Sequence, residues 1–169
     1  PDLGRASDIR LRPIGANPSA DDAALLATWR NDQPRAFFTW IESTAASTQR
    51  WLSGVYGPDP RDILVVLEDA QGVPFGHLGL VGFSEDEPGG RTCELVRVLR
   101  GTSGGPRGAM SRAIEHLVGW AVEALGVETV VLEVFADNAP AIACYERCGF
   151  ELVERWGLTR TDVPNMVRW

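Results

Sequence analysis

The sequence predicts a mixed α/β fold. An apolar, β-favouring run at 95–99 leads into a glycine-rich turn, and apolar residues then recur at helical spacing over 110–125. Two further apolar runs, 63–67 and 75–81, are joined by Asp69-Ala70-Gln71-Gly72, a composition suited to a hairpin. With 169 residues, of which 44% are hydrophobic, the chain can bury one sizeable core.

The first third of the chain is expected to form a strand and two helices. Residues 1–8 are predicted to be a flexible leader, and residues 9–169 a single domain that starts with a strand at 9–14. Ser19 is well placed to cap a helix over 20–32, which Gln33-Pro34 should end. A second helix is expected at about 44–56.

The remaining segments alternate between strands and turns. The acidic, Gly/Pro-rich stretch 84–90 predicts a solvated loop before a central strand that begins at Thr92. Further strands are expected at 130–135, 152–156 and 163–169.

The net charge of −7 limits the classes of partner. Nucleic acid and anionic membranes would both repel the protein at long range, so we expect neither as a partner. An acidic protein suits a cationic or amine-bearing substrate. No apolar run approaches the length that spans a bilayer and no signal peptide pattern is seen, so the predicted location is the cytoplasm.

The three cysteines carry no metal-binding or redox spacing. Cys144 and Cys148 are one helical turn apart, and Cys93 falls in a strand. We therefore expect reduced cysteines that mostly belong to the core, and we predict no metal site.

The turn from Arg100 to Gly108 predicts an anion-binding site. Its glycines let the backbone fold tightly, while the helix that follows offers unpaired N–H donors and a positive dipole end. Two arginines in the turn add positive charge. A pyrophosphate group would fit such a cradle. The alternative is a flexible connection in which Thr102 or Ser103 only caps the helix.

A second motif, Asn138 to Phe150, makes the prediction more specific. It reads Asn-x-x-Ala-Ile-x-x-Tyr-Glu-x-x-Gly-Phe, and together with the glycine turn and the strand between them it resembles the GNAT N-acetyltransferases. The resemblance implies acetyl-CoA as co-substrate and a twisted, mostly antiparallel sheet of about seven strands, splayed near the central strand. This chain departs from the family pattern at Pro106, which lies in a lengthened turn.

The predicted cofactor-binding residues come from the turn, the strand before it and the second motif. The turn itself supplies the arginines and glycines, whereas the resemblance implies that the strand pairs with the pantetheine arm and that Asn138 contacts it. Asn138 could instead only cap its helix. The complete set is Val98, Leu99, Arg100, Gly104, Gly105, Arg107, Gly108, Ala109, Asn138 and Tyr145.

Acetyl transfer from a thioester to an amine needs an acid for the thiolate and a base for the amine. Tyr145 occupies the position of the family's general acid, although it could simply pack on the sheet. Glu94, at the start of the central strand, is the first candidate for the base, and His77 is the second because its ordinary pKa lies near neutrality. Each of these two could instead have no chemical role, Glu94 as a solvated carboxylate and His77 as a structural histidine.

Two short motifs bear on the acceptor. Trp29-Arg30-Asn31 and Gln49-Arg50-Trp51-Leu52 resemble segments of the amino-sugar branch of the family, which would make Trp29, Arg30 and Asn31 substrate-binding residues. Phe38, between the two motifs, would add an aromatic face of the kind that a sugar or other small ring needs. The alternative is that the tryptophans only anchor two helices on the sheet.

The sequence therefore predicts an N-acetyltransferase that acts on a primary amine of a small molecule, with an amino sugar slightly favoured. Protein N-termini, antibiotic amines, longer acyl chains and a non-catalytic CoA-binding module remain as alternatives. A homodimer is the oligomeric state considered.

Overall fold

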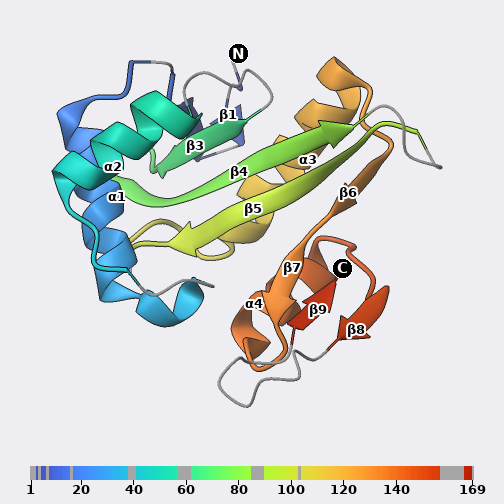
Figure 1. The fold of residues 1–169 in the computed structure, drawn as a ribbon. Coiled ribbons are helices and arrows are strands. Elements are labelled where there is room, and N and C mark those ends of the chain that lie inside the picture. Colours follow the sequence, from blue (N-terminus) through green and yellow to red (C-terminus); the bar gives the residue numbers. More distant parts are fainter. Residues whose placement is uncertain are drawn as a thin grey trace.

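The computed structural model arranges the chain as two sheets with helices packed against them (Figure 1). The structure describes residues 3, 5–6, 8–15, 17–37, 41–56, 62–84, 90–102, 104–156 and 166–168. Among these residues, no helix is both long enough and apolar enough to cross a membrane.

The larger sheet has six strands in the order of the sequence. They are β1 (Arg5–Ala6), β2 (Ile9–Pro13), β3 (Ile63–Glu68), β4 (Pro74–Ser84), β5 (Thr92–Arg100) and β6 (Thr129–Val131). The first five are antiparallel to their neighbours, and β6 is added parallel to β5. The predicted hairpin at 69–72 is confirmed, with the Asp69 carboxylate accepting from the amides of Gln71 and Val73.

The predicted mixed α/β fold with a mostly antiparallel sheet is confirmed, but the expected number of about seven strands in one sheet is not exact. A second sheet, ordered β7-β9-β8, is formed by β7 (Glu133–Phe135), β8 (Glu154–Trp156) and β9 (Met166–Arg168). The single strand expected at 130–135 is broken at Leu132, whose side chain is buried. The chain thus leaves one sheet and enters the other at this residue.

The helices lie on both faces of the larger sheet. They are α1 (Ala20–Asp32), the 3-10 turn η1 (Pro34–Ala36), α2 (Ala45–Trp51), the π turn η2 (Leu52–Tyr56), α3 (Ala109–Leu125) and α4 (Ala139–Arg147). As predicted, the Ser19 side chain caps α1 by accepting from the Asp22 amide. Thr44 and Ser47 form a capping box at α2, and Gly126, with a left-handed backbone, ends α3.

Alternation along β3 divides the core into two layers. Val65 and Leu67 belong to a cluster with α3, while Leu64 and Val66 belong to a cluster with α1 and Leu52. Because neighbouring side chains of a strand point to opposite faces, the apolar run of β3 from Ile63 to Leu67 is buried from both sides.

Part of the predicted leader belongs to the fold. Leu3 is buried in the α3 cluster, and its carbonyl lies 2.6 Å from Nε2 of His116 on α3. β1 pairs antiparallel with β2. The first residues were expected to be loose because strand β1 is too short to show any alternation.

The two sheets part next to the central strand β5. β6 pairs with β5 only from Thr92 to Glu94, and after Leu132 the chain continues as β7, which pairs with β9 instead. β5 itself runs on to Arg100. The predicted splay is therefore present, and it begins at Glu94.

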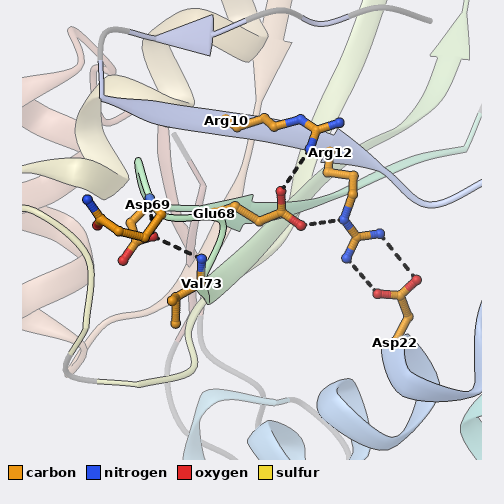
Figure 2. A network of polar contacts seen from close by, with 7 residues as sticks. Arg10, Arg12, Asp22, Glu68, Asp69 and Val73 are labelled. Atoms are coloured by element: carbon orange, nitrogen blue, oxygen red, sulfur yellow. Dashed lines mark hydrogen bonds and ion pairs between the residues drawn. The ribbon is translucent and has the colours of Figure 1, made fainter.

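An arginine network fixes α1 to the sheet (Figure 2). Arg12 on β2 donates to both carboxylate oxygens of Asp22 on α1, at 3.2 and 2.7 Å, and to Glu68 on β3. Both carboxylates are buried. Burial by itself raises the pKa of Asp22, but the hydrogen bonds from Arg12 and Ser19 outweigh it, and the pKa is lowered overall.

Replacing Arg12 with Met should destabilise the protein, because it leaves the buried carboxylate of Asp22 without its cation and Glu68 with only the half-exposed Arg10. The expected loss is near the lower end of the about 3–5 kcal/mol that follows removal of one partner of a buried pair. Arg10, which is half exposed and contacts Glu68 at 3.4 Å, is the control. Arg10→Met should cost less than about 1 kcal/mol. Urea unfolding measures both, and equal losses would mean that the network does not depend on Arg12.

Candidate active site

The turn between β5 and α3 is held against β4 by its backbone. The amides of Gly101 and Thr102 both donate to the Phe75 carbonyl, at 2.9 and 3.3 Å. A side chain at position 101 would overlap the ring of Trp29 on α1. The turn is thus fixed between α1 and the start of β4.

The Arg100 side chain stabilises this turn by hydrogen bonds to its carbonyls. Its guanidinium donates to the carbonyls of Thr102 at 3.2 Å and Gly104 at 2.8 Å. Gly105 has a left-handed backbone with φ of 79°, and a Cβ there would lie 2.7 Å from the Phe75 ring. That Arg100 and these glycines hold a cofactor stays a prediction; in this structure they shape the turn.

The first turn of α3 presents backbone donors. Gly108, with φ of 72°, precedes the helix, and no side chain caps it. The Ala109 amide donates to the Pro106 carbonyl at 3.1 Å, and the Arg112 amide donates to the Gly108 carbonyl at 3.2 Å. In the part of the chain that the structure describes, the amides of Met110 and Ser111 have no backbone acceptor. Donors of this kind at a helix N-terminus suit an anion.

The helix that carries Tyr145 lies beside this turn. Ser111 Oγ is 3.2 Å from Cys144 Sγ, and the Cys148 thiol donates to the Ser111 carbonyl at 3.6 Å. These contacts join the first turn of α3 to α4. The structure therefore brings the predicted pyrophosphate cradle and the predicted acid onto adjacent elements.

Tyr145 is buried and keeps its proton. It packs in the main core cluster with its ring edge-on to Phe150, at a centroid distance of 6.1 Å. Burial raises the pKa of Tyr145, and the neighbouring Cys144 and Cys148 raise it further. At the start of the same helix, the Asn138 side chain accepts from the Ala141 amide at 3.3 Å, so it does cap α4.

The thiol pair on α4 is a feature that sequence reasoning missed. The neighbouring Cys148 thiol, Ser111 and Arg147 together lower the pKa of Cys144 against the opposing effect of burial. The same contact between the two thiols raises the pKa of Cys148. The one-turn spacing of the cysteines was visible in the sequence, but the contact with Ser111 on another helix was not.

The two candidate bases have different environments. His77 on β4 is 4% exposed and stacks on Trp29 at a centroid distance of 6.0 Å. Burial lowers the pKa of His77 to about 4, so the ring is neutral at pH 7. Glu94 is half-buried in β5, where it forms the last pair with β6 before the sheets part.

The strand residues predicted to pair with the pantetheine arm lie past this point. Leu99 is buried opposite His77, and Val98 packs against the core cluster. Arg107 is the remaining arginine of the turn, and its carbonyl accepts a hydrogen bond from the Arg112 guanidinium at 2.8 Å.

The residues predicted to bind the acceptor surround the end of α1. Trp29 is buried, and Arg30 lies over the ring of Phe37, 4.2 Å from its centroid. The Asn31 side chain bonds both the amide and the carbonyl of Ser43, each at 2.8 Å. It thereby ties α1 to the segment before α2. Phe38 lies outside the described residues.

Among the residues that the structure describes, no group of three or more His, Cys, Asp or Glu side chains is able to hold a metal ion.

Comparison with known proteins adds family and fold. The family model described as the acetyltransferase (GNAT) domain matches residues 9–151. A spermidine N-acetyltransferase from Vibrio cholerae, solved in complex with CoA and spermine, is similar with a TM-score of 0.80 and 17% identity. That match covers 96% of this chain and 94% of the other.

A dodecameric structure of a spermidine N-acetyltransferase from the same organism has a TM-score of 0.73, 18% identity and coverage of 96% and 92%. At these identities the likeness establishes the fold. No curated protein matches the sequence.

Cys144 should be the most reactive thiol of the protein. Because the pKa of Cys144 is lowered, it carries more thiolate near neutral pH than Cys93, whose pKa burial raises to about 11. Iodoacetamide labelling followed by peptide mass spectrometry should show Cys144 modified first, with a rate that rises at a pH below the ordinary thiol pKa. In Cys148→Ala the midpoint should move toward the ordinary pKa, since the neighbouring thiol is gone. Faster labelling of Cys93 would contradict this assignment.

Proposed function

Because the chain belongs to the GNAT acetyltransferase family, we propose that it transfers an acetyl group from acetyl-CoA to a primary amine of a small cationic molecule. Membership of the family makes it an acetyl-CoA-dependent N-acyltransferase. The proposal concerns the acceptor and the residues that carry the reaction.

The observation that best supports the proposal is that the two sheets separate beside β5: β6 pairs with β5, but β7, which follows it in the chain, pairs with β9. Beyond Glu94, the pairing of β5 with β6 ends, and β5 leads directly to the glycine turn and the first turn of α3. A molecule with an extended amide-bearing arm and a pyrophosphate would match both features. We therefore place the pantetheine arm along Val98 and Leu99 and the pyrophosphate at Gly108 and Ala109.

The reaction requires an acid at the sulfur end of this opening. The amine nitrogen attacks the thioester carbonyl, the carbon–sulfur bond breaks, and the thiolate takes a proton. We assign that proton to Tyr145, whose raised pKa keeps the hydroxyl protonated well above neutral pH. Glu94, at the point where the sheets part, is the residue that we propose to take the amine proton, directly or through water.

The acceptor is proposed to be a polyamine or another small amine with positive charge. The net charge of −7 would attract such a molecule. The similar structures are spermidine N-acetyltransferases, one of them bound to spermine. The amino-sugar alternative rests on Trp29, Asn31 and Gln49, and their side chains make contacts within the fold: Gln49, for example, donates to the Pro18 carbonyl at 2.9 Å.

Thiol release from acetyl-CoA should be seen with small polyamines. The measurement uses spermidine, an amino-sugar nucleotide, an aminoglycoside and a peptide with a free N-terminus as parallel acceptors. Turnover with the polyamine and little with the peptide is the expected result. Turnover with the amino-sugar nucleotide alone would restore the sugar interpretation. CoA binding without turnover of any amine would favour a non-catalytic CoA-binding module.

Tyr145→Phe should separate chemistry from binding. The change removes only the hydroxyl, so proton delivery fails and turnover should fall about 10²- to 10⁴-fold. Affinity for CoA, measured by calorimetry, should be unchanged. In the parent protein, Tyr145 should cause no fall in rate below pH 10, because its pKa is raised above the ordinary value. Full turnover by the Phe variant between pH 6 and 9 would refute the assignment.

Gly108→Val should weaken CoA binding, because a side chain at this position would crowd the amides that face the pyrophosphate. Gly126, at the other end of α3, also has a left-handed backbone, with φ of 67°. Gly126→Val is therefore a control with matched backbone strain. Both variants should lose stability, but only the change at 108 should raise the Kd for CoA. Equal affinities of the two variants for CoA would indicate that the pyrophosphate binds at Gly104 and Gly105 instead.

A further inference from the structure

One residue of the central strand has an unusual backbone. Arg97 on β5 has φ of 55°, the left-handed region, and of the described residues other than glycine it alone has a positive φ. A side chain with a Cβ is strained in this conformation. Such strain persists only where the surrounding structure enforces it, and it is concentrated at functional sites.

The strain coincides with a bulge in the sheet. His77 on β4 pairs with Leu99, but Gly79, two residues further on, pairs with Val96. Between these two pairs, Leu78 of β4 therefore faces two residues of β5, and those two, Arg97 and Val98, form the bulge. The bulge lies past Glu94, in the part of β5 that no longer pairs with β6.

The Arg97 side chain is held from two directions. Its guanidinium donates to both carboxylate oxygens of Asp62, at 2.6 and 3.2 Å, and lies 5.1 Å from the ring centroid of Trp51. Asp62 precedes β3 and Trp51 ends α2, so the anchors come from different elements. Both charged side chains are largely buried, with exposed fractions of 27% for Arg97 and 17% for Asp62.

The arginine crosses a strand to reach its partner. β4 lies between β3 and β5, and at this level it carries Gly79, which pairs with Leu64 on one side and Val96 on the other. A residue without a side chain leaves room on the strand surface. Gly79 has little freedom itself, because a Cβ there would collide with the Ile63 carbonyl.

The backbone of the bulge has its own anchor. The Arg97 backbone interacts with the His77 ring and raises the pKa of His77 against the stronger effect of burial. The ring is fixed in turn by its stacking on Trp29.

We propose that Arg97 is a positioning residue, held by Asp62, Trp51 and His77 so that β5 stays bulged where the thioester of acetyl-CoA must lie. The inference rests on the proposed function, because it assigns the bulge to the acyl end of that site. Arg97 acts through the shape of its own backbone, and its guanidinium does not contact the substrate. His77 then serves as an anchor of the bulge and not as the base.

The backbone conformation supplies a test. Glycine adopts the left-handed region without strain, whereas alanine does not. Arg97→Ala loses the side-chain contacts with Asp62 and Trp51 but keeps the strain of a left-handed backbone, so the bulge should relax. As a result, kcat should fall about ten-fold, with the KM for the amine little changed. Arg97→Gly loses the same anchors without the strain, and it should keep kcat within about three-fold of the parent.

A double-mutant comparison isolates the ion pair. Asp62→Asn should lower kcat in the Arg97 protein and should have no further effect in Arg97→Gly. Arg10→Met, which breaks an ion pair on the far strand β2, is the control for a general loss of charge contacts and should leave kcat unchanged.

Two results would overturn the proposal. Equal loss of kcat in the Ala and Gly variants would mean that the guanidinium itself acts on the substrate, and full activity in both would mean that the bulge needs no anchor. Stability gives a readout that does not depend on turnover: Arg97→Gly should unfold at higher urea than Arg97→Ala. If the parent turns over no amine, the proposed acceptor fails, while the urea midpoints still decide whether the anchors hold the bulge.

Discussion

The hydrogen-bonding of the central strand is the constraint on which the rest of the structure depends. β5 pairs with β4 over most of its length, but β6 follows it only as far as Glu94. Main-chain donors and acceptors away from water need partners, and within the described chain β6 and β7 do not supply them past this point. The opening between the sheets is therefore bordered by a strand edge suited to an extended ligand with amides.

The other parts of the site follow from the direction of β5. The strand ends at Arg100, so the glycine turn and the first donors of α3 must lie at the end of the opening. The contact of Ser111 with Cys144 then places α4, and with it Tyr145, against the same turn. The proposed anion site and the proposed proton donor are thus positioned by one strand and by one contact between two helices.

The local elements were predictable because their signals lie within a few residues. Ser19 at α1, the Asp69 turn and the glycine that ends α3 each act on their own backbone, and the pattern is visible in the sequence. The second motif placed Tyr145 on a helix by resemblance, and α4 confirms that helix.

The division into two sheets, the strand β1 and the bulge at Arg97 could not be predicted in this way. Each depends on contacts between residues far apart in the chain, such as Arg97 with Asp62 or Leu3 with His116. Periodicity shows which side chains are buried, but it does not show which strand a strand pairs with, or where that pairing stops. The roles of Trp29 and Asn31 were uncertain for the same reason, since their partners lie on other elements.

Hydrogen exchange of the backbone amides, measured with and without CoA, tests the central claim most directly. The claim predicts slower exchange on CoA binding at residues 95–99 of β5 and 108–111 of α3, with β2 and β3 unchanged. Protection confined to other elements, or none along the edge of β5, would contradict the claim that the opening between the sheets holds the cofactor.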